Sequence, residues 1–296
     1  MKIIDLTQYK NYYFIGDPHG IDIIYNILNS YINENNMLDN SILFFCGDNG
    51  IGFDTAEETH KKLELCNEFA IKHNLHLILV RGNHDNPYFY NESNILNKSN
   101  ITLVEDYTIV KTYDNNVLCI GGSISVDRTN RALNKTWWNK EEIIPINDEI
   151  ENELSNLNFN IDIVCSHNCP TYEKPKNIDK YNQGEIVDNW SVWDSKLLDD
   201  NFIDRSKMNA IHEVLQAKLK NNLKYWIYGH YHNHYESIRT HPKFICLDMY
   251  YKNIVIVKKV TTKTYKTNGY FYKAGPDILD IHDESKFSNI KFIETK

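Results

Sequence analysis

The chain has 296 residues, of which 42% are hydrophobic and 24% charged, and its formal net charge is −8 at pH 7. This composition is typical of a soluble globular protein with one large domain or two ordinary ones, and the acidic balance argues against tight nonspecific binding to a polyanion. The apolar runs are too short to span a bilayer and the N-terminus lacks the features of a signal peptide, so we expect a cytoplasmic location and no membrane partner.

The first third of the chain alternates between strand and helix patterns. Residues 21–32 and 55–72 carry apolar side chains at helical spacing. The strand-like runs around them are residues 12–15, 42–46 and 75–80. This order predicts parallel strands joined by helical crossovers.

The middle of the chain begins with shorter strands. Residues 107–113 and 117–120 are separated by polar turn residues and predict a β-hairpin. A helix is expected over residues 148–157, with Asp148 as its N-cap. Residues 161–165 form the next expected strand.

After an irregular stretch up to Asp204, Ser206 is expected to cap a helix that ends at Leu219. Further strand-like runs are residues 224–228, 235–238, 244–248 and 254–260. These elements predict a single α/β domain over residues 1–296, with two mixed β-sheets packed face to face and helices outside.

Two segments stand apart from this core. Residues 168–205 are interpreted as a lid insertion, with a loop packed away from the site or a subunit contact as alternatives. Residues 261–296 are interpreted as a C-terminal extension that docks on the core. The six cysteines contain no CxxC pair, which favours buried free thiols.

Metal-binding side chains follow five of the expected strands. They are Asp17 and His19, Asp48, Asn83 with His84 and Asp85, His167, and His230 with His232. Each of these histidines alone is better explained as an ordinary packing or surface residue. Ligands of open α/β sheets gather at the carboxyl ends of strands, however, so the joint placement predicts one shared site.

The ligand types define the chemistry of that site. Carboxylate, amide and imidazole groups without thiolates suit Mn²⁺ first, with Fe or Zn²⁺ as alternatives. Two cations about 3.5–4 Å apart can clamp a phosphate and activate a water molecule. We expect Asp48 to bridge two such ions, Asp17 and His19 to share one of them, and Asn83 to supply a neutral oxygen.

The five segments resemble the motifs D-x-H, G-D, G-N-H-[D/E], H and G-H-x-H of the calcineurin-like metallophosphoesterase family, in the same order over residues 12–260. The resemblance implies that family's sandwich of two mixed sheets. It also implies two ligand sets that share Asp48. The first set is Asp17, His19, Asp48 and His232, and the second is Asp48, Asn83, His167 and His230. His84 would assist the leaving group, and Asp85 would orient its imidazole.

One departure concerns the residues after Asp48, where many relatives carry another Asp. Asp54 lies further along the chain, which weighs against the serine/threonine protein phosphatases.

Residues 121–127 resemble a segment of small bacterial and phage-type members. Arg128 and Arg131 follow it and are interpreted as a phosphate clamp, with solvated surface arginines as the alternative.

The sequence therefore predicts a dimetal phosphoesterase that hydrolyses phosphomonoesters or phosphodiesters by metal-activated water attack. A metal-dependent nuclease is an alternative that the acidic charge disfavours. A non-catalytic metal-binding scaffold is the other alternative. Neither the physiological substrate nor the oligomeric state follows from these patterns.

Overall fold

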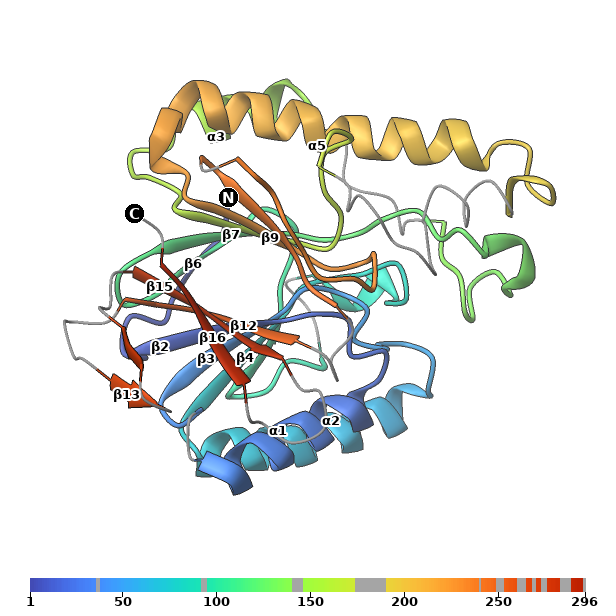
Figure 1. Cartoon of the computed structure of the whole chain (residues 1–296). Coiled ribbons are helices and arrows are strands. Elements are labelled where there is room, and N and C mark those ends of the chain that lie inside the picture. Colours follow the sequence, from blue (N-terminus) through green and yellow to red (C-terminus); the bar gives the residue numbers. More distant parts are fainter. Residues whose placement is uncertain are drawn as a thin grey trace.

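The computed structural model describes residues 1–35, 38–91, 95–139, 146–173, 190–239 and 241–248, together with the backbone of five strands beyond residue 248. Its core contains two seven-stranded sheets packed face to face (Figure 1). Among the described helices, none is long and apolar enough to cross a membrane.

The first sheet is built around the parallel strands of the N-terminal third. Its strand order is β16-β15-β12-β2-β3-β4-β5, with β2, β3, β4 and β5 parallel and β12 antiparallel to β2. The strands are β2 (Asn11–Ile15), β3 (Ser41–Phe45), β4 (Leu75–Leu79), β5 (Ile101–Leu103), β12 (Asn253–Lys259), β15 (Pro276–His282) and β16 (Asn289–Glu294). The predicted βαβαβ arrangement is confirmed.

The second sheet uses the middle of the chain. Its order is β1-β6-β7-β8-β9-β11-β10, and β7, β8 and β9 run parallel. The strands are β1 (Ile3–Asp5), β6 (Thr108–Lys111), β7 (Asn116–Ile120), β8 (Ile163–Ser166), β9 (Tyr225–Tyr228), β10 (Tyr235–Glu236) and β11 (Lys243–Cys246). Strands β6 and β7 are antiparallel, as the predicted hairpin requires.

Helices cover the outer faces of both sheets. Helices α1 (Ile21–Asn35) and α2 (Ala56–Lys72) pack on the first sheet, and α3 (Asp148–Ser155) and α5 (Leu197–Leu219) on the second (Figure 1). The layers are therefore helix, sheet, sheet and helix. This is the expected α/β sandwich of two mixed sheets flanked by helices.

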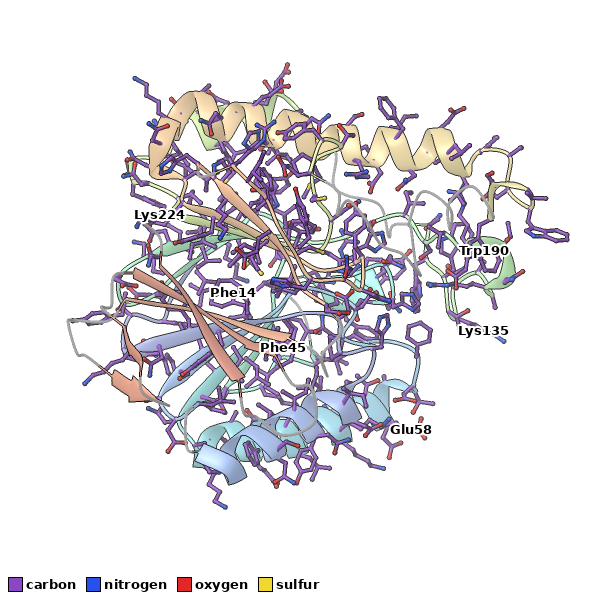
Figure 2. The ribbon with its side chains drawn as sticks, in the orientation of Figure 1. Phe14, Phe45, Glu58, Lys135, Trp190 and Lys224 are labelled. Carbon is purple, nitrogen blue, oxygen red and sulfur yellow. The ribbon has the colours of Figure 1, made fainter. Side chains whose placement is uncertain are left out.

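Alternating side chains divide the core into layers. Phe14 and Phe44 stack with ring centroids 4.9 Å apart in the cluster between the sheets, whereas Phe45 belongs to the cluster beneath α1 and α2 (Figure 2). Successive side chains of a strand point to opposite faces, and here both faces are covered. This double burial explains why the strands read as continuous apolar runs.

Two predicted helix starts are wrong. Asn147, not Asp148, is the N-cap of α3, since its side chain accepts a hydrogen bond from the Ile150 N–H at 2.9 Å. Helix α5 begins at Leu197, and Ser206 lies inside it with its hydroxyl donating to the Phe202 carbonyl at 2.7 Å. Tertiary contacts described below hold the first turns of α5, so local capping chemistry did not reveal its start.

The two segments that stand apart from the core are described in part. Residues 174–189 of the predicted lid lie outside the described residues, while α5 begins within its second half. In the predicted C-terminal extension, β15 and β16 join the first sheet, and β13 (Tyr265–Thr267) pairs with β14 (Tyr270–Tyr272). All six cysteines are buried and free, as expected.

Candidate functional site

The predicted metal-binding residues follow the carboxyl ends of five strands. Asp17 comes after β2, Asp48 after β3 and Asn83 after β4 in one sheet, and His167 after β8 and His230 after β9 in the other. Because the two sheets pack face to face, these ends converge on one place. Asp17, Asp48, Asn83, His167 and His230 are all buried there.

The first predicted ligand set forms a tight cluster. Ligand atoms of Asp17, His19, Asp48 and His232 all lie within 4.8 Å of one another. His19 Nε2 and His232 Nε2 are 2.8 Å apart, and His232 Nε2 is 3.2 Å from Asp17 Oδ2. Two imidazole nitrogens facing each other beside carboxylates form a donor set suited to a divalent cation.

The second predicted set surrounds His167. Its Nε2 atom is 2.9 Å from Asn83 Oδ1 and 3.3 Å from Asp48 Oδ1. The His230 ring lies 4.9 Å from the His167 ring, centroid to centroid. Asp48 thus contacts both groups of residues, with its Oδ2 atom 3.9 Å from His19 Nε2.

One buried atom supports a cation at this place. Asp17 Oδ2 accepts a hydrogen bond from the His230 N–H at 2.8 Å, but Asp17 Oδ1 has no hydrogen-bond partner among the described residues although it is fully buried. A buried carboxylate oxygen normally has a partner, because leaving it without one costs desolvation energy. A bound cation would satisfy this oxygen, so the residues fit the metal that the sequence implies.

Glycines allow the ligands to approach this closely. A Cβ atom at Gly47 would overlap the His167 ring, one at Gly82 would overlap Asp48, and one at Gly229 would overlap Asp17. These glycines belong to the G-D, G-N-H and G-H-x-H segments. Because there is no room for a Cβ atom at these positions, each segment pairs a glycine with a ligand.

The protonation of the cluster depends on burial and on mutual charges. Burial opposes ionisation of Asp48, but the imidazoles of His167, His84 and His19 outweigh it and hold the Asp48 pKa well below its usual range. Burial, reinforced by His167, lowers the pKa of His230 well below its usual value. A carboxylate and a neutral imidazole are the forms in which these groups bind metals.

His84, the predicted catalytic histidine, contacts Arg131. Arg131 Nη2 lies 2.5 Å from His84 Nε2, and the same guanidinium pairs with Asp127 Oδ1 at 2.7 Å. Burial and Arg131 lower the pKa of His84 to about 4 against the opposing charge of Asp48, so the neutral imidazole accepts the hydrogen bond from Arg131. The His84 backbone N–H donates to Asp48 Oδ1 at 2.8 Å, which ties this residue to the cluster.

Asp85 does not have the expected contact with the His84 ring. Its buried carboxylate accepts hydrogen bonds from the N–H groups of Gly82 at 2.8 Å, Asn49 at 3.1 Å and Ile51 at 2.9 Å. Burial, and then the Asp48 charge, raise the Asp85 pKa. Orphan backbone donors in two loops are satisfied by one carboxylate, so Asp85 joins the loops instead of orienting the imidazole.

Arg128 and Arg131 are separated in the structure. Arg128 pairs with Asp194 at 2.5 Å and with Asp200 at 2.6 Å, and it thereby connects the turn η2 (Arg128–Asn130) to the start of α5. Arg131 is the arginine that contacts the predicted catalytic histidine. Of the two arginines interpreted as phosphate-binding residues, Arg131 lies beside the cluster, whereas Arg128 is engaged by Asp194 and Asp200.

Sequence reasoning missed a layer of hydroxyl and amide groups behind the ligands. Ser125 Oγ accepts from Asn83 Nδ2 at 2.9 Å, Ser123 Oγ lies 3.0 Å from His230 Nε2, and Asn168 Nδ2 donates to Ser123 Oγ at 2.9 Å. These bonds orient the Asn83 oxygen toward His167. The available signal was the alternation Ser123-Ile124-Ser125, which puts both hydroxyls on one side and Ile124 in an apolar cluster.

Comparisons with known proteins place this geometry in context. The chain is 26% identical over 179 residues to an uncharacterized protein of Acanthamoeba polyphaga mimivirus, a match that covers 60% of this chain and 48% of that protein. The match therefore spans about half the length of this relative.

Two solved structures are similar at low sequence identity. A putative 5′-nucleotidase from Staphylococcus aureus is 13% identical with a TM-score of 0.48, covering 94% of this chain and 55% of that one. A cold-active protein-tyrosine phosphatase of a psychrophilic Shewanella species is 12% identical with a TM-score of 0.39, covering 95% and 81%.

A family model matches most of the chain. The calcineurin-like phosphoesterase model aligns with residues 10–234, a range that includes all five ligand-bearing segments, strands β2 to β5 of the first sheet and strands β6 to β9 of the second. The motifs, the two-sheet sandwich and this match agree. The chain belongs to the calcineurin-like phosphoesterase family.

Proposed function

We propose that this protein hydrolyses phosphate esters with two divalent cations. One cation would be held by Asp17, His19, Asp48 and His232, and the other by Asp48, Asn83, His167 and His230. The observation that best supports this proposal is the position of Asp48, whose two carboxylate oxygens face His167 and His19 respectively. When bound, the cations would neutralise the phosphate and lower the pKa of an attacking water molecule. Manganese is the first candidate, with iron and zinc as alternatives.

The chain's own residues prepare the site for this chemistry. Asn83 presents its amide oxygen toward His167 because Ser125 accepts a bond from its amide nitrogen. The neutral amide limits the negative charge that would repel an anionic substrate. His167 Nδ1 lies 2.8 Å from the Cys46 carbonyl, which fixes the imidazole with Nε2 toward Asp48. Such supporting contacts reduce reorganisation during the reaction.

His84 and Arg131 would act together at the leaving group. Arg131 donates to the neutral imidazole, so His84 holds a permanently charged guanidinium beside the cluster. The Arg131 guanidinium would stabilise the negative charge that develops on the leaving oxygen. We assign Arg128 to holding α5 and Asp85 to joining loops, and neither to contact with substrate.

Hydrolysis of two chromogenic esters tests the proposal. Protein stripped with a chelator and reloaded with Mn²⁺ is assayed with p-nitrophenyl phosphate, a monoester, and bis-p-nitrophenyl phosphate, a diester. We expect activity that depends on the cation. Asp48→Asn should lose about 100-fold or more in rate and bind fewer cations per chain, because a carboxamide is a poor bridge between two ions.

The matched control is Asp22→Asn. Asp22 lies on the surface of α1 and pairs with Lys62, so this variant should keep wild-type activity and cation binding. Two bound cations in Asp48→Asn would contradict the bridging role. Two bound cations without hydrolysis of any ester would favour a binding scaffold, and cleavage of an oligonucleotide at rates comparable to the esters would favour a nuclease.

A further inference from the structure

An exposed aromatic ring lies beside the candidate catalytic histidine. The Phe53 ring stacks on the His84 imidazole with centroids 5.9 Å apart and planes 25° apart. On its edge it contacts Trp138 at 5.6 Å, nearly perpendicular. Trp138 is buried, whereas 42% of Phe53 remains exposed. One surface of the phenyl ring is thus supported by the protein, and a large part is available to a ligand.

The loop around Phe53 is fixed on both sides. Before it, the Ile51 N–H donates to Asp85 at 2.9 Å and the Asn86 N–H donates to the Ile51 carbonyl at 2.6 Å. After it, Thr55 forms a capping box with Glu58 at the start of α2. A ring held on such a loop loses little conformational entropy when a ligand stacks on it.

The chemistry of the neighbours indicates the kind of ligand. His84 connects Phe53 to the cation cluster, since its N–H bonds to Asp48 and its ring lies 5.0 Å from the His19 ring. Arg131 donates a hydrogen bond to the same imidazole. The alcohol portion of a phosphate ester bound at the cluster with its leaving oxygen beside His84 and Arg131 would lie near Phe53. An aromatic group there can stack with the ring, which an aliphatic group cannot do.

We propose that Phe53 forms a subsite for a planar aromatic ring in the alcohol portion of the phosphate ester. The inference rests on the proposed phosphoesterase function and adds a substrate class to it. In the competing explanation, Phe53 only shields His84 and Trp138 from water. Shielding would affect all esters alike, whereas stacking favours aromatic ones.

Matched esters separate these explanations. Benzyl and 2-phenylethyl phosphate are compared with cyclohexylmethyl and 2-cyclohexylethyl phosphate, using Mn²⁺-loaded enzyme. Each pair has a primary alcohol as leaving group and rings of similar size, so the pair differs mainly in aromaticity. For at least one chain length, we expect wild-type kcat/KM to favour the aromatic ester about three- to ten-fold.

The variants assign this preference to one ring. Phe53→Leu should bring the ratio close to one while both esters are still hydrolysed, and Phe53→Trp should retain the preference. Tyr113→Leu is the control, because Tyr113 is an exposed aromatic that follows β6, next to the start of β7 and so away from the strand ends that carry the site. A wild-type ratio near one at both lengths, or a preference that Phe53→Leu leaves unchanged, would overturn the proposal.

Binding separates a failure of this inference from a failure of the proposed function. The phosphonate analogues of the same esters cannot be hydrolysed, and titration calorimetry on Mn²⁺-loaded protein measures their affinities. If no ester is hydrolysed, the phosphoesterase function fails, but an aromatic preference in binding that depends on Phe53 would still support the subsite. Equal binding of aromatic and aliphatic phosphonates would reject it.

Discussion

Four of the residues at the candidate site have left-handed backbone conformations. His19, Asp48, His230 and His232 have φ values of 54°, 53°, 70° and 48°. Such conformations cost about 1–3 kcal/mol each for residues other than glycine. Each lies within four residues of the end of a strand, in a loop that brings its side chain to the cluster. The loops support one another in this shape, since the His19 N–H donates to the Asp48 carbonyl at 2.8 Å.

At the scale of single residues, the space at Gly82 should control cation binding. In Gly82→Ala the new methyl group must displace Asp48, so Mn²⁺ affinity should fall about 10- to 100-fold, a loss comparable to that of other supporting contacts. Isothermal titration of the metal-free protein with Mn²⁺ measures this change. Gly20→Ala is the matched control, because its methyl group would meet only the Ile23 side chain at an ordinary 3.8 Å. Equal losses in the two variants would contradict the steric explanation.

At the scale of elements, α5 is connected to the loop that carries Arg131. The helix buries Met208, Ile211 and Leu215 against the second sheet, while its N-terminal part continues past the strands in Figure 1. Arg128 fastens that part through Asp194 and Asp200. Two ion pairs from one half-buried guanidinium thus connect α5 to the turn η2, which ends immediately before Arg131.

Removing the Arg128 side chain should loosen this connection without removing a substrate contact. In Arg128→Gln we expect faster amide hydrogen exchange in the first turns of α5, because the neutral side chain cannot replace both charge-assisted bonds. The exchange of α2 serves as an internal reference. Asp194→Asn should produce a similar change while retaining the guanidinium. A large rise in KM for Arg128→Gln alone would show instead that Arg128 binds the phosphate.

At the scale of the whole molecule, buried imidazoles couple stability to pH. Burial lowers the pKa of His76, in β4, to about 4, and burial with the nearby Arg239 lowers the pKa of His212, in α5, to about 4. These residues lie in opposite halves of the sandwich, and neither belongs to a predicted ligand set. Protonating either one places a charge in an apolar layer.

We expect stability to fall as the pH decreases from about 6.5 to about 4. In this window the unfolded chain binds protons that the folded chain excludes, so proton binding lowers the free energy of the unfolded state relative to the folded state. Below about pH 4 both states are protonated and this contribution becomes constant. His76→Gln can keep a hydrogen bond to Thr102, which now lies 2.9 Å from His76 Nε2, and should reduce the loss by about 2–3 kcal/mol.

Urea denaturation at pH 7 and pH 4.5 measures the difference between the two proteins. Carboxylates contribute equally to both, so the comparison isolates one imidazole. An identical pH dependence in wild type and His76→Gln would show that His76 is solvated enough to titrate normally in the folded state.

Local sequence patterns were enough to predict the sandwich and the side chains that meet at its edge. Short apolar runs that form strands of four or five residues, with Asp17, Asp48, Asn83, His167 and His230 just beyond them, were sufficient, because parallel strands bring their carboxyl ends to one edge of a sheet. The helical periods of α1 and α2 were equally local, and the structure confirms both helices. Periodicity and order along the chain carry this information.

Hydrogen bonds and ion pairs between side chains distant in sequence are visible only in the packed structure. Nothing local to Asp85 shows that its carboxylate serves Asn49 and Ile51, and nothing local to Arg128 shows that it meets Asp194 and Asp200. The same holds for Arg131 on His84 and for Phe53 on that imidazole. A polar side chain can satisfy its hydrogen bonds with many partners, and only the packed chain determines which partner is close enough.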